Sequence, residues 1–256
     1  MAFTTLTDDK FYYGRRQLID YDRTAQPTYG YEPLTPEDFL DPQEHDTFNH
    51  GPRHDQVVLR LYAIFRQHYR VNPLVAVFTG VKLVWDIPEL AQPVADVVVV
   101  PGAESWDSQR TQVNVAAEGT RPTLIIEAVS PRFVAGDLEH KVGIYAAAGV
   151  QEYFIVDSGE REDRSDIAYR VIGYRLRDGV YQPIAADEQG RLYSETARVW
   201  FMPTADRQQI DIISKRTGQP IEPDPNSLTS PAAARAEATF RANSIASRLN
   251  LGQDDS

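Results

Sequence analysis

The sequence predicts one α/β or α+β domain with an extension at each end. Of the 256 residues, 42% are hydrophobic and 10% aromatic, which is enough apolar material for a packed core. A strand-like run, a helical segment and a second strand-like run follow one another between residues 123 and 156. This order favours a crossover that pairs the two strands in parallel. The predicted division is an N-terminal arm at residues 1–45, a core domain at 46–215, and a linker with a C-terminal helix at 216–256.

Composition excludes several classes of protein. No apolar run approaches the roughly 18 residues of a membrane span, and the N-terminus lacks the pattern of a signal peptide, so we expect a cytoplasmic protein. The absence of cysteine excludes disulfides, thiol nucleophiles and cysteine zinc sites. The net charge of -11 disfavours non-specific, charge-driven DNA binding. A local basic groove or divalent cations can still bring phosphates to such a surface.

Residues 1–45 are rich in Tyr, Pro and Asp and show no clean period. We expect an extended arm that packs its aromatic side chains on the domain or on a neighbouring subunit. Within it, Thr35 can cap a short helix that has Pro36 at its first position and Asp38 three residues after the cap. Pro42 ends this helix.

A helix is predicted at residues 52–69. Val58, Leu61 and Phe65 repeat at spacings of three and four, which is the pattern of one buried helix face. His54 precedes Val58 by four residues and therefore shares the inward face.

The next apolar runs predict strands. Gly80 separates runs at residues 75–79 and 81–85 and indicates a bulge or tight bend. The valine run at 94–100 is typical of a central strand that is buried on both faces. Residues 101–122 are polar, and we expect a long surface connection there.

The second half begins with a strand at residues 123–129, which a Ser-Pro pair ends. A helix follows at about 137–148, with Asp137 at its start and Gly149 just past its end, and then a short strand at 152–156. The remaining predicted elements are antiparallel strands at 167–176, 180–184, 191–194, 197–201 and 209–213, a linker at 220–225, and an Ala-rich helix at 230–249 that needs a partner surface.

Two carboxylates lie within these apolar strands. Glu127 shares a strand face with Ile125 and Val129, and Asp96 opens the valine run. Burying an ionised carboxylate alone costs several kcal/mol, so each must be paired, protonated, metal-bound or at a cleft. Together they could form an oxygen-rich site that suits Mg²⁺ or Mn²⁺ and a phosphate substrate. Equally, each could pair with an arginine or cap a loop, and the residues alone leave both explanations open.

Basic side chains nearby have ordinary explanations. Lys141 follows Asp137 by four residues, which by itself favours an exposed helical ion pair worth roughly 0.3–0.5 kcal/mol. His45, His50 and His54 are spaced closely enough for a zinc site to be conceivable, but no loop carboxylate completes an obvious set.

The motif order is more specific than any single residue. After Asp96 come E-A-V-S-P from Glu127 and D-L-x-x-K-x-x-x-Y-x-x-x-G-V-x-E-Y-x-x-V-D from Asp137 to Asp157. This order resembles the Uma-type restriction endonuclease family, a branch of the PD-(D/E)XK nuclease superfamily that is common in cyanobacteria. The upstream P-L-T-P-E-D-F-L, the H-D-x-V-V-x-x-L helix and the Ala/Arg-rich C-terminal helix are similar too, so the resemblance covers about residues 33–250.

The resemblance implies a mixed β-sheet flanked by helices, here with an added antiparallel strand region. It implies Asp96 and Glu127 as ligands of Mg²⁺ or Mn²⁺, with the carbonyl of Ala128 as a further ligand. The family's usual proline before the aspartate is replaced by Ala95. The activity implied is metal-dependent hydrolysis of phosphodiester bonds in nucleic acid, with DNA as the first candidate.

The superfamily's usual lysine, two residues after the glutamate, is replaced by Val129. The resemblance is to the branch in which a helical lysine takes over, which makes Lys141 the proposed catalytic lysine. His54 would lie at the edge of the site. The alternatives are an inactive nuclease fold that serves as a binding or assembly module, and a structural homo-oligomer formed through the aromatic arm and the Ala-rich helix. We expect the chain to form a homo-oligomer, as a homodimer.

Overall fold

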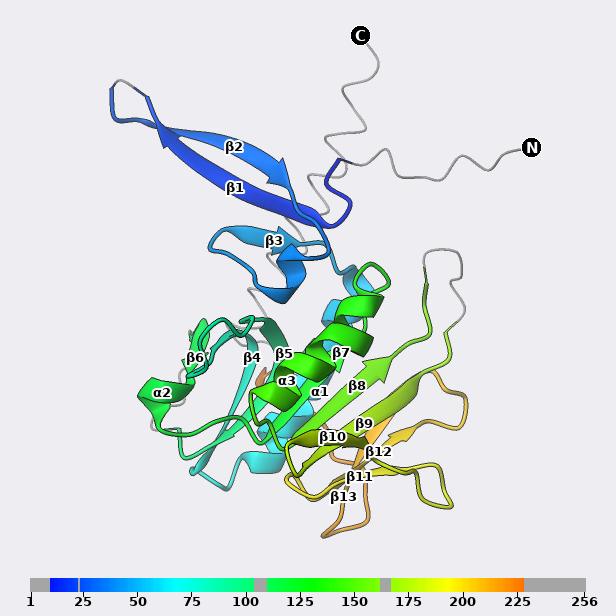
Figure 1. Ribbon diagram of the computed structural model, residues 1–256. Coiled ribbons are helices and arrows are strands. Elements are labelled where there is room, and N and C mark those ends of the chain that lie inside the picture. The colour runs from blue at the N-terminus through cyan, green and yellow to red at the C-terminus, as the bar shows by residue number, and fades with distance from the viewer. Residues whose placement is uncertain (1–9, 23, 104–109, 162–166, 228–256) are drawn as a thin grey trace, which may run out of the picture.

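The computed structural model describes residues 10–22, 24–103, 110–161 and 167–227 (Figure 1). Within these residues the chain forms a central seven-stranded mixed sheet and a few helices. One three-stranded sheet precedes the central sheet in the sequence, and another follows it. The predicted mixed sheet flanked by helices is thereby confirmed. The helix predicted at 230–249 lies outside the described residues.

The central sheet has the strand order β10-β9-β8-β7-β5-β4-β6. β7 and β8 pair in parallel, as the strand–helix–strand order predicts, and β4 and β6 are also parallel. The other neighbours are antiparallel. The bounds are β4 (Val75–Val84), β5 (Val94–Pro101), β6 (Gln112–Asn114), β7 (Leu124–Ala128), β8 (Glu152–Asp157), β9 (Arg170–Arg177) and β10 (Val180–Pro183).

Helices cover both faces of this sheet (Figure 1). One face carries α1 (Pro52–Tyr69), whose Leu61 and Phe65 pack on the strands as their spacing predicts. The other face carries α3 (Lys141–Ala147), whose Tyr145 lies in a second apolar cluster. No helix in the described part of the chain has the length and apolar character of a membrane span.

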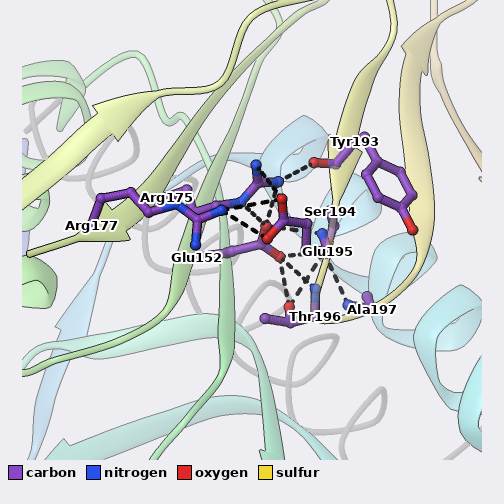
Figure 2. Close-up of polar contacts among 8 residues, drawn as sticks. All are labelled: Glu152, Arg175, Arg177, Tyr193, Ser194, Glu195, Thr196 and Ala197. Atoms are coloured by element: carbon purple, nitrogen blue, oxygen red, sulfur yellow. Dashed lines mark hydrogen bonds and ion pairs between the residues drawn. The ribbon is translucent and has the colours of Figure 1, made fainter.

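A C-terminal sheet packs beside α1 on the same face and is tied to the central sheet by Glu152 (Figure 2). The Glu152 carboxylate accepts hydrogen bonds from Arg175, from the hydroxyls of Ser194 and Thr196, and from the main-chain N–H groups of Glu195 and Thr196. The side chain is 1% exposed, so it is a buried charge with its hydrogen bonds satisfied. The strands of this sheet are β11 (Leu192–Ser194), β12 (Val199–Pro203) and β13 (Ile210–Ser214).

The N-terminal region is more ordered than an extended arm. Its first two strands form an antiparallel hairpin, and the third strand pairs with the first. Thr35 and Asp38 bond reciprocally, since the Thr35 N–H donates to Asp38 Oδ2 at 2.9 Å and the Asp38 N–H to Thr35 Oγ1 at 3.4 Å. The predicted short helix is a single 3-10 turn. The elements are β1 (Gly14–Tyr21), β2 (Pro27–Pro33), η1 (Asp38–Leu40) and β3 (Asp46–Phe48).

Two further predictions need correction. The connection at 101–122 contains the edge strand β6 and the four-residue helix α2 (Val115–Glu118). The helix expected from Asp137 begins instead as a π-helical turn, η2 (Gly136–His140), before α3, and Asp137 caps nothing. A π turn shifts the side chains that follow it, and such turns recur at functional sites.

Gly80 lies inside one continuous strand, β4, rather than between two strands. Its φ is +59°, and the β4–β5 ladder skips the position opposite Asp96, between the pairs Thr79↔Val97 and Val81↔Ala95. No residue is added, so the glycine makes a bend and not a bulge. A side chain here would meet no atom within 4 Å.

Replacing Gly80 with alanine is therefore expected to destabilise the protein by about 1–2 kcal/mol through backbone conformation alone. Gly143, in α3, likewise has open space where a methyl group would lie, but its φ is an ordinary helical one. Gly143→Ala should be neutral or stabilising by up to about 1 kcal/mol. Urea unfolding of both variants tests this, and equal effects would contradict it.

Candidate active site

Asp96, Glu127 and Lys141 come together at one end of the central sheet. Asp96 is near the start of β5 and Glu127 near the end of β7, and the antiparallel pair Val97↔Ile126 makes them neighbours. Lys141 is the first residue of α3, and its Nζ lies 3.1 Å from Glu127 Oε1. The structure thus brings together three residues that the sequence places on separate elements.

Main-chain groups link the two carboxylates. The Asp96 N–H lies where the ladder with β4 is interrupted at Gly80, and it donates to Glu127 Oε2 at 3.2 Å. In return, Asp96 Oδ2 accepts from the Ala128 N–H at 2.8 Å. A main-chain N–H of β5 therefore holds the Glu127 carboxylate, and a main-chain N–H of β7 holds the Asp96 carboxylate. Ala128 follows Glu127 at the end of β7, and its N–H is the group that binds Asp96.

Lys141 is buried rather than exposed. Its side chain is 1% exposed and bridges Glu127 and Asp137, at 3.1 Å from each. The i,i+4 pair with Asp137 predicted from spacing exists, but the prediction of a solvent-exposed pair is wrong. Val129, where the superfamily's usual lysine stands, packs in the apolar cluster on the same sheet face. The ammonium therefore reaches the Glu127 carboxylate from the helix.

Aromatic side chains cover this ammonium. The Phe39 ring, on η1, has its centroid 4.1 Å from Lys141 Nζ and stacks on Phe133 at 4.3 Å. Phe39 is 5% exposed. A side chain on Gly136 would place a Cβ 2.7 Å from Phe39 Cδ1, so glycine permits this close fit. We call Phe39 and Phe133 the aromatic cover.

His54 lies at the edge of the site, where the resemblance places it. Its Nε2 is 3.2 Å from Asp96 Oδ2 and its Nδ1 is 3.2 Å from Asp55 Oδ1, and its ring stacks on His50 at 4.3 Å. Burial lowers the pKa of His54, but the carboxylates of Asp96 and Asp55 outweigh it and raise that pKa to about 10. His54 is thus a cation that faces Asp96, and with both ring nitrogens engaged it does not serve the zinc site considered for the histidines.

The three carboxylates respond differently to this environment. Burial raises the pKa of Glu127 well above its usual value despite Lys141, and it raises the pKa of Asp137 to about 6. Burial also opposes ionisation of Asp96, but His54 and Lys141 lower the pKa of Asp96 below its usual range. Burial is thus the main cause of the raised pKa values of Glu127 and Asp137, and the neighbouring carboxylates add to it, whereas the cations beside Asp96 keep that residue ionised.

The donor set fits a hard divalent cation. Mg²⁺ commonly binds through one or two carboxylates and keeps several waters. Asp96 and Glu127 would supply those carboxylates, and the main chain of Ala128 contacts Asp96 through its N–H. Asp137 Oδ1 is buried without a hydrogen bond, although it lies 3.1 Å from Lys141 Nζ. Across the described residues, no three or more His, Asp or Glu side chains are arranged as a metal cage, so the fit is to a two-carboxylate site.

Asp137 and Tyr145 are buried in the cluster, but the sequence pattern assigns neither of them a role in the site. It indicates Asp137 only as a helix start and Tyr145 only as one position of the family motif. The Tyr145 hydroxyl donates to Glu127 Oε1 at 2.6 Å. Asp137, Lys141 and Tyr145 follow one another at intervals of four, and this spacing on one helical face is the signal that the sequence offers.

A cavity of about 480 Å³ lies elsewhere, beside Arg121, Gly149 and Gln151. The Arg121 guanidinium is already paired with Asp86 and with the carbonyl of Ala148. The titratable residues that line it, Asp86 and Arg121, are paired with each other, so the carboxylate cluster is the better candidate for the site.

The chain is similar to known proteins in structure and in sequence. A putative nuclease of the DUF820 group from Anabaena variabilis, known from its crystal structure, has 13% sequence identity and a TM-score of 0.44 over 64% of this chain and 91% of its own. No curated protein matches the chain. The profile of the Uma2 family, described as putative restriction endonucleases, matches residues 49–202, a shorter range than the resemblance in the motifs. That segment holds Asp96, Glu127, Lys141 and His54 and spans more than half of the sequence, so the chain belongs to the Uma2 family.

Proposed function

We propose that the chain is a metal-dependent endonuclease that hydrolyses phosphodiester bonds of nucleic acid, with Mg²⁺ or Mn²⁺ as cofactor and DNA as substrate. The observation that carries this proposal is the contact of 3.1 Å between Lys141 Nζ and Glu127 Oε1, beside Asp96. A lysine next to two carboxylates on adjacent strands combines a cation site with a fixed positive charge for the phosphate.

Asp96, Glu127 and the carbonyl of Ala128 are the proposed ligands. A divalent cation held by these residues would supply Lewis acidity toward the phosphate and would lower the pKa of a bound water. Burial lowers the pKa of Lys141, but Glu127, Asp137 and Asp96 raise it above its usual value, so its ammonium stays charged. The ammonium can therefore orient water and offset negative charge that develops on the phosphate. His54 holds the Asp96 carboxylate from the α1 side.

The test is a cleavage assay on supercoiled plasmid, linear duplex, single-stranded DNA and RNA, each with Mg²⁺, Mn²⁺ or EDTA. We expect cleavage that requires the metal and falls at least about 10²-fold in Asp96→Asn, which keeps the shape of the side chain but not its charge. Asp211→Asn is the matched control, because Asp211 is a partly exposed strand residue whose ion-pair contact with Arg60 is 3.8 Å long. It should cleave as the wild type does.

Calorimetry with Mn²⁺ distinguishes an active endonuclease from an inactive nuclease fold. If Mn²⁺ binds to the wild type and not to Asp96→Asn, yet no substrate is cut, the chain is an inactive nuclease fold used for binding or assembly. If Mn²⁺ does not bind at all, the metal-dependent proposal is overturned.

One observation favours assembly as an additional role. The hairpin of β1 and β2 exposes an apolar face on which Ile19 is paired with Tyr29 and Tyr21 with Pro27. Ile19, Tyr21 and Tyr29 are 40%, 66% and 58% exposed. The expected homodimer remains a prediction, and this face is the surface that it would use.

A further inference from the structure

Tyr145 contacts the proposed metal-binding carboxylate from the same helix as Lys141. It follows Lys141 by four residues, so both side chains project from one face of α3 toward the central sheet. Its hydroxyl donates to Glu127 Oε1 at 2.6 Å, and its ring is 0% exposed. The ring packs edge-on against Tyr153 at 4.9 Å and against Trp85 at 6.2 Å, which leaves the hydroxyl little freedom.

The contacts of Glu127 divide between its two oxygens. Oε1 receives the Tyr145 hydroxyl and lies 3.1 Å from the Lys141 ammonium, whereas Oε2 receives the Asp96 N–H at 3.2 Å. The terminal torsion of a glutamate is intrinsically broad, so its orientation depends on such contacts. With two side chains of α3 holding Oε1, Oε2 stays turned toward Asp96.

The hydroxyls of two neighbouring tyrosines, one buried and one partly buried, bond to the main chain instead. Tyr153 donates to the main-chain carbonyl of Asp137 at 2.9 Å, and Tyr181 donates to that of Val150 at 3.0 Å. Those contacts satisfy the tyrosine hydroxyl with a main-chain carbonyl. Tyr145 instead donates to a carboxylate that a metal site would use, and partners of this kind commonly tune the ligand they contact.

We propose that Tyr145 is a positioning residue, whose hydroxyl fixes the Glu127 carboxylate in the orientation that faces Asp96 and so prearranges the ligands for a divalent cation. This inference rests on the proposed function, because it assigns Tyr145 to the same site. It predicts that the hydroxyl matters for metal affinity and not only for packing.

The experiment is calorimetric titration of the full chain with Mn²⁺, with Tyr145→Phe beside Tyr181→Phe. Both variants lose one hydrogen-bonded hydroxyl and keep the ring, but Tyr181 is partly buried on β10 and bonds a main-chain carbonyl. We expect Tyr145→Phe to bind Mn²⁺ about 10- to 100-fold more weakly than the wild type. Tyr181→Phe should bind it as the wild type does, and the melting temperatures of the metal-free variants should fall by similar amounts.

Three results would overturn the assignment, and they differ in meaning. Wild-type affinity in Tyr145→Phe, with Mn²⁺ binding to the wild type, removes the role of Tyr145 and leaves the proposed function intact. Equal weakening in Tyr145→Phe and Tyr181→Phe means that loss of stability, not positioning, lowers the affinity. A wild type that binds no Mn²⁺ removes the proposed function itself, and the inference about Tyr145 with it.

Discussion

Replacing Lys141 with methionine is expected to lower the cleavage rate by about 10²–10³-fold and to destabilise the fold by about 3–5 kcal/mol. The rate falls because the positive charge beside the attacking water is lost. Stability falls because Glu127 and Asp137, each in contact with the ammonium and each at most 2% exposed, are left without it. Breaking one side of a buried ion pair is much more costly than removing both sides.

The loss of stability should depend on pH in a defined direction. The pKa of Asp137 is raised to about 6 in the folded protein, against an ordinary value of 3.8. An acid with a raised pKa opposes folding when it is ionised, so its cost is complete above about pH 6 and disappears as pH falls below 3.8. Lys141 lowers this pKa, and its removal raises it further. The deficit of Lys141→Met should therefore be largest near neutral pH and shrink on acidification.

Urea unfolding between pH 5 and 8 and the plasmid assay measure the two effects. Lys141→Arg keeps the charge and should retain more stability than Lys141→Met. Lys215→Met is the control, because Lys215 is an exposed lysine that lies over the Tyr193 ring at 4.6 Å. It should change neither quantity. Full cleavage activity in Lys141→Met would remove this residue from the mechanism.

Glu152→Gln is expected to destabilise the protein by about 3–5 kcal/mol without changing the site. Every hydrogen-bond partner of the Glu152 carboxylate is a donor: Arg175, two hydroxyls and two main-chain N–H groups. An amide would point its own N–H₂ group at some of these donors and would leave the partly buried Arg175 guanidinium without its full counter-charge. The connection between the central and C-terminal sheets should weaken.

The site should be unaffected, because Glu152 pairs with Leu124 at the start of β7, whereas Glu127 is near its end. Thermal unfolding and Mn²⁺ calorimetry together test this separation. Glu195→Gln is the matched control, since Glu195 pairs with Arg175 and Arg177 but is 48% exposed. Its effect should be within about 1 kcal/mol. A large loss of Mn²⁺ affinity in a folded Glu152→Gln would contradict the separation.

The parts of the site that follow local periodicity could be predicted from the sequence. Alternation along residues 123–129 puts Glu127 on the face with Ile125 and Val129, and those two apolar residues share one cluster in the structure. The strand–helix–strand order predicts the parallel pair of β7 and β8. Both depend on neighbours in the chain, which spacing encodes directly.

The parts that depend on distant contacts could not be predicted. The i,i+4 rule for Asp137 and Lys141 describes an exposed helix and does not contain the Phe39 ring that buries the pair. The π turn likewise has no distinct sequence pattern, so the sequence indicates a helix cap at Asp137. The hairpin of β1 and β2 has no predictive pattern either, because its apolar side chains are largely exposed and do not follow the period of a strand that packs on the core.

The aromatic cover also separates two parts of the chain. Asp96, Glu127 and Lys141 lie within the segment that matches the family, residues 49–202, but Phe39 precedes it. The ammonium is shielded by a residue from outside that segment, whereas the Asp96 side chain remains 16% exposed at the other side. Under the proposed function, a phosphate that approaches this site would therefore meet Asp96 before Lys141, because the Phe39 ring covers the ammonium. The N-terminal region would then control access to a lysine that the family segment supplies.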